Sequence, residues 1–119
     1  MTDKLILEKI EHTAKIIINN PSANTWDLES LSELEKMIAA LNKDDDIFSL
    51  VITGQGEKFF SAGADLKVFH EGGKEAAKEM SNAFSNAFGA LSKFRGVSIA
   101  AINGFAMGGG LECALACDI

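Results

Sequence analysis

Two stretches rich in glycine and alanine hold the residues best suited to chemistry in this sequence. The first is Ala62-Gly63-Ala64-Asp65-Leu66, and the second runs from Gly104 to Glu112. Small residues let a ligand approach the backbone closely, so main-chain N–H groups become the recognition elements. The second stretch also opens a predicted helix, whose first N–H groups have no partner inside the helix. If N–H groups of the two stretches converge, they form an oxyanion hole that stabilises negative charge on a carbonyl oxygen.

Two familiar phosphate-binding loops do not fit the second stretch. The glycines at 104, 108, 109 and 110 do not have the G-x-G-x-x-G spacing of a dinucleotide site. No Gly-Lys-Ser/Thr follows them, as a nucleoside triphosphate loop requires. A glycine-rich turn before a helix is as consistent with tight packing as with ligand binding, so both interpretations stay open.

Glu112 is the other informative residue, because it stands in the first turn of an otherwise apolar helix. Leu111 and Cys113 flank it, and a carboxylate is costly to bury among such neighbours. One interpretation is an acid that interacts favourably with the helix dipole. The other is a general acid/base that faces a cleft.

The cysteines and histidines do not predict a metal site. Cys113 and Cys117 stand four residues apart, but their apolar neighbours favour buried free thiols. No histidine or second cysteine pair completes a ligand set around them. His12 falls in a predicted hairpin turn and His70 at a helix edge, where neither has a nucleophile or ligand set nearby. We therefore expect no metal.

Length and composition indicate one globular domain over residues 1–119. The chain has 119 residues, is 47% hydrophobic and carries a net charge of −6. This acidity, without a basic cluster, disfavours nucleic acid as a partner. No apolar run approaches the roughly 18–20 residues of a membrane span, and the N-terminal residues lack the features of a signal peptide. We expect a cytoplasmic protein with no membrane partner.

Strand and helix patterns alternate along the chain, which indicates an α/β fold with a largely covered sheet. The polar segment between the first two strands predicts a hairpin, and Asn20–Asn24 a loop. Asp27 is the predicted N-cap of the first helix. The predicted strands are Leu5–Ile10, Lys15–Asn19, Ser49–Thr53 and Ser98–Ile102, and the predicted helices are Leu28–Asn42, Lys74–Phe94 and Leu111–Cys117.

The two small-residue stretches also resemble a known family. Ser61–Lys67 resembles the first signature of the enoyl-CoA hydratase/isomerase (crotonase) superfamily, and Ala100–Glu112 resembles the second. Asn20–Asn24 is similar to the family's loop after its second strand, near the coenzyme A pocket. The resemblance runs in order over essentially the whole chain. It implies the N-terminal part of a crotonase-like ββα spiral core, truncated at residue 119 before the family's C-terminal helices.

The resemblance implies specific roles for the candidate residues. The backbone N–H groups of Ala64 and Gly109 would hold the thioester oxygen and stabilise the enolate formed when C2 gains or loses a proton. Glu112 matches one of the two glutamates that hydratases use to add water across the double bond. The positions expected to bind the CoA thioester are Ala23, Ala62, Ala64, Asp65, Leu66 and Gly109.

The resemblance favours one reaction among several. The second catalytic glutamate would lie beyond Ile119, and isomerases of the family depend mainly on that later acid. Glu112 therefore favours a 2-enoyl-CoA hydratase of fatty acid metabolism. The alternatives are a double-bond isomerase, another reaction of the superfamily, or a non-catalytic acyl-CoA-binding protein. Coenzyme A enters only as part of the substrate, no cofactor is implied, and the full-length assembly would be a homotrimer or a dimer of trimers.

Overall fold

The computed structural model describes residues 2–119, except for the side chains of Val68 and Phe69. Within that part of the chain, strands and helices alternate as the sequence predicts. In chain order they are β1 (Leu5–Ile10), β2 (Thr13–Ile18), α1 (Leu28–Asn42), β3 (Ser49–Gly54), β4 (Phe59–Ser61), α2 (Leu66–Ser92), β5 (Val97–Ala101), β6 (Phe105–Ala106) and α3 (Gly109–Leu115).

The strands form two sheets. The larger has the order β1-β2-β3-β5, and the smaller pairs β4 with β6. β1 and β2 form the predicted antiparallel hairpin, whereas β2, β3 and β5 are parallel, as expected for strands joined through helices. β4 and β6 are short and were not predicted, because Phe59–Leu66 shows no strand periodicity. β4 comes directly before the first small-residue stretch, and β6 lies near the start of the second.

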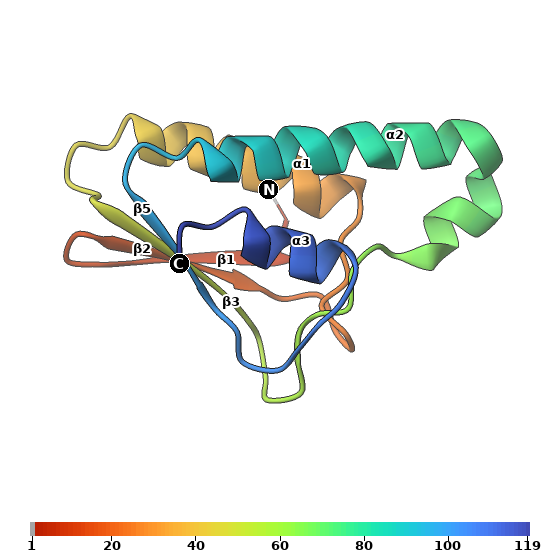
Figure 1. Cartoon of the computed structure of the whole chain (residues 1–119), viewed down its shortest axis with the longest axis horizontal. Coiled ribbons are helices and arrows are strands. Elements are labelled where there is room, and N and C mark those ends of the chain that lie inside the picture. The colour runs from red at the N-terminus through yellow and green to blue at the C-terminus, as the bar shows by residue number, and fades with distance from the viewer. Residues whose placement is uncertain (1) are drawn as a thin grey trace.

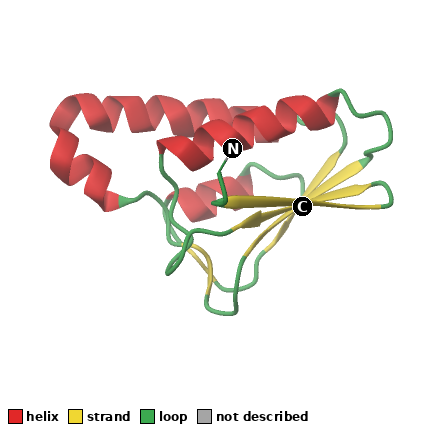
Figure 2. Ribbon diagram, turned by 180° about the vertical axis from the view of Figure 1, so that it is seen from behind, coloured by secondary structure: helices red, strands yellow, loops and turns green. Residues whose placement is uncertain are grey.

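The helices α1 and α2 lie along the same side of the larger sheet (Figure 1), and the view from behind shows the same layering (Figure 2). The short helix α3 contacts α2 and the smaller sheet. Burial alternates along β3, where Leu50 and Ile52 are buried and Val51 and Thr53 are partly exposed. The continuous apolar runs predict a largely covered sheet. In the described residues α1 and α2 cover one face, so the other is only partly shielded.

Helix α1 begins and ends where its sequence pattern predicts. Its buried apolar positions, Leu31, Leu34, Ile38 and Leu41, recur every three or four residues and form one stripe against the core. Asp27 is the N-cap: its carboxylate accepts a hydrogen bond from the Ser30 amide at 2.9 Å, and the Asp27 amide donates to the Ser30 hydroxyl at 3.0 Å. This reciprocal pair satisfies two amides that the helix leaves without partners.

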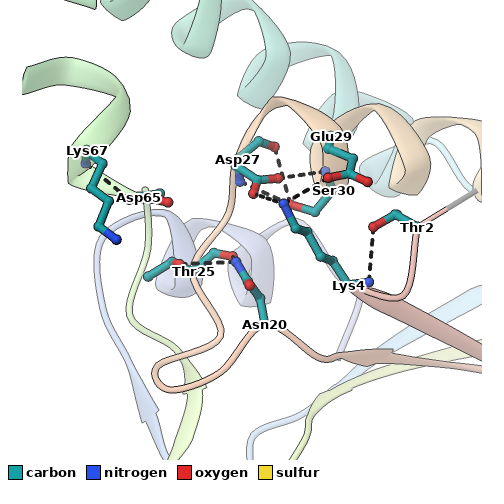
Figure 3. Close-up of polar contacts among 9 residues, drawn as sticks. All are labelled: Thr2, Lys4, Asn20, Thr25, Asp27, Glu29, Ser30, Asp65 and Lys67. Atoms are coloured by element: carbon teal, nitrogen blue, oxygen red, sulfur yellow. Dashed lines mark hydrogen bonds and ion pairs between the residues drawn. The ribbon is translucent and has the colours of Figure 1, made fainter. Parts of the chain in front are cut away.

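Lys4 ties the first strand to the start of this helix. Figure 3 shows its ammonium group between Asp27, at 2.6 Å, and Glu29, at 2.8 Å. Partial burial raises the pKa of Asp27, but the hydrogen bonds from Lys4 and Ser30 outweigh that effect and hold the pKa below its ordinary value. Hydrogen bonds to the same carboxylates raise the pKa of Lys4. The cap is therefore charged when the protein is folded at neutral pH.

Asp27→Ala is expected to lower the free energy of unfolding by about 1 kcal/mol, the usual cost of losing an N-cap. Asp27→Asn, which retains a capping oxygen but loses the charge, should cost less. Because folding lowers the Asp27 pKa, the charge stabilises the protein above the unfolded-state value of 3.8 and stops doing so as the pH falls through the folded value. Urea unfolding of the full protein at several pH values measures both effects. Equal stability of the wild type and the alanine variant would contradict this role.

Helix α2 begins earlier than its sequence predicts. The apolar spacing from Lys74 onward predicts the helix correctly, but the helix starts at Leu66 and is interrupted at Gly73, whose φ of 63° is not helical. The break separates two helical segments, and the first is too short for its apolar residues to show a helical period in the sequence. Asp65 caps that first segment, since its carboxylate accepts from the Lys67 amide at 3.1 Å (Figure 3). Aspartate is a common N-cap, so Asp65 was the one residue from which a helix start at Leu66 could have been predicted.

Candidate active site

The pairing of β4 with β6 brings the two small-residue stretches together. Phe59 lies opposite Phe105 and Ser61 opposite Ala106. The Met107 amide then donates to the Ser61 carbonyl at 3.0 Å. Gly110 packs on the same carbonyl so closely that any side chain there would overlap it. Segments more than 40 residues apart in sequence therefore leave the smaller sheet side by side.

Gly63 and Gly109 lie against each other where the two stretches meet. Gly63 has a φ of +103°, a conformation that favours glycine. A Cβ atom at Gly63 would lie 3.1 Å from the Gly109 nitrogen, and one at Gly109 would lie 3.6 Å from the Gly63 Cα. The residue after Gly63 is Ala64, so the two candidate amides belong to neighbouring pieces of backbone.

Trp26 holds the backbone on either side of Ala64. The Trp26 amide donates to the Gly63 carbonyl at 2.7 Å, and the Trp26 carbonyl accepts from the Asp65 amide at 2.8 Å. In this parallel pairing of Trp26 with Ala64, the N–H of Ala64 itself points away from Trp26. Among the described residues, neither this N–H nor that of Gly109 donates a hydrogen bond. Both amides are therefore available to a ligand.

A groove of about 630 Å³ runs past these two residues. Helix α2 lines it with Phe84, Phe88 and several small side chains, and Ala64, Gly109 and Glu112 line it as well. The structure therefore places the three predicted catalytic residues around one groove. Glu112 is exposed rather than buried among apolar neighbours, because α3 turns Gly110 and Cys113 toward the core. Its carboxylate keeps its hydration, so no burial cost arises.

The other predicted binding residues lie outside this groove. The Ala62 amide donates to the Ala23 carbonyl at 2.9 Å, which joins the loop after β2 to the first stretch. Asp65 caps α2, as described above, and Leu66 is 75% exposed at the start of that helix. None of these four side chains lines the groove that contains Glu112.

Two asparagines, whose partners local sequence does not predict, hold the turn between β3 and β4. Asn103 donates to the carbonyls of Gly54 and Gly56, both at 2.9 Å, and accepts from the Gly54 amide at 3.0 Å. Asn24, which is buried, donates to the Phe59 carbonyl at 3.0 Å. Together they fix the turn between β3 and β4. The sequence shows only that both asparagines stand in predicted turns. Their position in a turn does not indicate which distant residues they bond.

Both cysteines are free thiols; Cys113 is buried as predicted, whereas Cys117 is only partly buried. Cys113 is buried, and burial raises its pKa well above the ordinary value. Burial also raises the pKa of Cys117 to about 11. Within residues 2–119, no cluster of three or more His, Cys, Asp or Glu side chains could hold a metal ion. No described helix is both long enough and apolar enough to cross a membrane.

Comparison with known proteins decides the family. The sequence profile described as enoyl-CoA hydratase/isomerase matches residues 8–119. The chain belongs to the enoyl-CoA hydratase/isomerase family. Its relatives include a crotonyl-CoA hydratase of Syntrophomonas wolfei, 38% identical over 117 residues, and a short-chain-enoyl-CoA hydratase of Clostridium acetobutylicum, 36% identical over 118 residues. Each alignment covers 98% of this chain and 45% of the relative, so the chain spans about half the length of these family members.

Solved structures of the family confirm the fold. Pseudomonas aeruginosa DspI superimposes with a TM-score of 0.97 at 66% identity, covering 99% of this chain and 48% of DspI. An enoyl-CoA hydratase from Bacillus anthracis gives a TM-score of 0.95 at 33% identity, covering 98% of this chain and 46% of that structure. The expected crotonase-like α/β core is therefore confirmed for the residues described.

Proposed function

We propose that the full protein is an acyl-CoA thioester enzyme, and specifically a 2-enoyl-CoA hydratase. The single observation that supports the proposal is that Ala64, Gly109 and Glu112 line one groove, with the Ala64 and Gly109 amides unpartnered among the described residues. The names of the family members, which include hydratases of crotonyl-CoA and short-chain enoyl-CoA, support the substrate class.

In the proposed chemistry, the two amides stabilise negative charge on the thioester oxygen, and Glu112 transfers protons. The thioester oxygen accepts hydrogen bonds from the N–H groups of Ala64 and Gly109, which stabilises the enolate that forms as water oxygen bonds to C3. Glu112 acts as a general acid/base on the water or on C2. The water hydroxyl ends on C3 and its proton on C2, so no electrons are exchanged. The reaction therefore needs no redox cofactor, and we propose none.

Binding of the coenzyme A portion is assigned to the approach to the groove. Ala62 and Ala23 are joined by a backbone hydrogen bond beside the first stretch, where small side chains leave the backbone accessible. Asp65 and the exposed Leu66 follow directly along the chain. We propose that these four residues contact the coenzyme A part of the thioester, and that the acyl part enters the groove.

A product analysis tests the function. The full protein is incubated separately with a short trans-2-enoyl-CoA and with the corresponding 3-enoyl-CoA, and the products are identified by mass spectrometry. A product heavier by one water from the 2-enoyl substrate is expected. Conversion of the 3-enoyl to the 2-enoyl isomer without water uptake would instead indicate an isomerase. Binding of both thioesters without conversion would indicate a non-catalytic acyl-CoA-binding protein. Light scattering of the same preparation tests the expected homotrimer or dimer of trimers.

A further inference from the structure

A continuous series of three aromatic rings connects the segments that carry the two candidate amides. Trp26 is fully buried and meets Phe88 edge-on, with ring centroids 5.6 Å apart and an interplanar angle of 77°. Phe88 meets Phe84 with centroids 5.4 Å apart and an angle of 58°. Both contacts have the geometry that aromatic pairs favour. We call Trp26, Phe88 and Phe84 the aromatic ladder.

Each end of the aromatic ladder contacts one of the amide segments. At one end the backbone of Trp26 holds the peptide groups on both sides of Ala64, at 2.7 and 2.8 Å. At the other end the ring of Phe84 packs on Gly109, because a Cβ there would lie only 2.7 Å from the Phe84 Cε1 atom. Phe84 and Phe88 are four residues apart on α2, so the helix fixes their separation.

The smaller sheet alone does not fix the two amides relative to each other. The Met107 to Ser61 hydrogen bond is the last backbone bond between the two stretches among the described residues, and it precedes Gly63 and Gly109. Beyond it, packing contacts rather than backbone hydrogen bonds set the separation of the two segments. The aromatic ladder is in contact with both. The buried Trp26 Nε1 has no hydrogen-bond partner among the described residues, so the indole contributes shape there rather than polar contacts.

We propose that the aromatic ladder is a positioning device that sets the distance and direction of the Ala64 and Gly109 N–H groups. This inference rests on the proposed function, because it requires a carbonyl oxygen that both groups bind. Trp26 is its most informative member, since it does not line the groove and has no side-chain route to the substrate. Shortening Trp26 should therefore alter the amides without removing a substrate contact.

Trp26→Leu in the full protein is expected to lower kcat about tenfold to a hundredfold, the effect of a displacement of about 1 Å in a catalytic group, with KM unchanged. Trp26→Phe retains a ring toward Phe88 and should recover most of the activity. Phe94→Leu is the matched control, because Phe94 is a core residue outside every aromatic pair among the described residues. Circular dichroism establishes that each variant is folded, and if Trp26→Leu does not fold, Trp26→Phe and Trp26→Met are compared instead.

Infrared difference spectroscopy separates positioning from a general loss of stability. The probe is a saturated acyl-CoA with a ¹³C-labelled thioester carbonyl, whose stretching frequency falls when the oxygen accepts hydrogen bonds. We expect a downward shift on binding to the wild type and to Phe94→Leu, and a smaller one in the folded Trp26 variant. A full shift with undiminished kcat in that variant would overturn the role of the aromatic ladder and leave the proposed function intact. The absence of a shift in the wild type would overturn both.

Discussion

Glu112→Gln in the full protein is expected to reduce the hydration of a short enoyl-CoA by about a hundredfold to ten-thousandfold, the usual contribution of a general acid/base. The glutamine has nearly the same shape, but it cannot accept and return a proton. Because Glu112 is exposed on the groove wall, the substitution leaves no buried group without a partner. Binding of a saturated acyl-CoA, measured by calorimetry, should therefore be unchanged while kcat falls.

A matched substitution on another helix distinguishes the role of this carboxylate from the effect of one lost charge. Glu75 is exposed on α2 and does not line the groove, so Glu75→Gln should retain full activity. Turnover of the Glu112 variant equal to that of the Glu75 variant would remove Glu112 from the proposed mechanism. The two amides would then remain as binding groups only.

Gly109→Pro should lower kcat by about a hundredfold to a thousandfold, which corresponds to the 2.7–4 kcal/mol, approximately, that one oxyanion donor contributes in a protease. Proline removes the N–H that is proposed to bind the thioester oxygen. Gly109 is the first residue of α3, and proline is well tolerated at that position of a helix. The helix should therefore persist, and steady-state kinetics on the enoyl thioester measures the loss.

Gly109→Ala is the control for the added atoms. It introduces the same Cβ, which would press on the Phe84 ring from 2.7 Å, but it retains the N–H. The alanine variant should therefore be impaired less than the proline variant, and the ratio of their kcat values reports the contribution of the hydrogen bond. Equal turnover of the two variants would mean that the Gly109 amide binds no developing charge.

Helix α1 shows how much of the fold follows from local sequence. Its bounds, its buried stripe and the Asp27 cap were all predictable, because each depends on residues a few positions apart. The β1–β2 hairpin was predictable for the same reason, although its second strand begins at Thr13 rather than Lys15. Helix α2 was placed correctly only after Gly73, where its periodicity becomes continuous.

The site was only partly predictable, because its geometry depends on long-range pairing. The residue types marked the two small-residue stretches and Glu112 as candidates, and the family resemblance then singled out Ala64 and Gly109 and implied the role of each residue. Their placement around one groove, however, depends on β4 and β6, which are too short to show a strand pattern. It also depends on Trp26, whose backbone forms hydrogen bonds with residues 63 and 65. The sequence around Trp26 gives no indication of these distant partners. Hydrogen bonds between distant turns follow from topology rather than from composition.

The buried thiol of Cys113 can report how often helix α3 opens locally. The residue follows Glu112 directly and is fully enclosed, and its raised pKa keeps it protonated and unreactive at neutral pH. An alkylating reagent reaches it only when α3 separates from its neighbours. The rate of alkylation at Cys113 therefore measures how often α3, which carries Glu112, separates from the core. A bound acyl-CoA that bridges the groove would slow that rate, independently of any turnover.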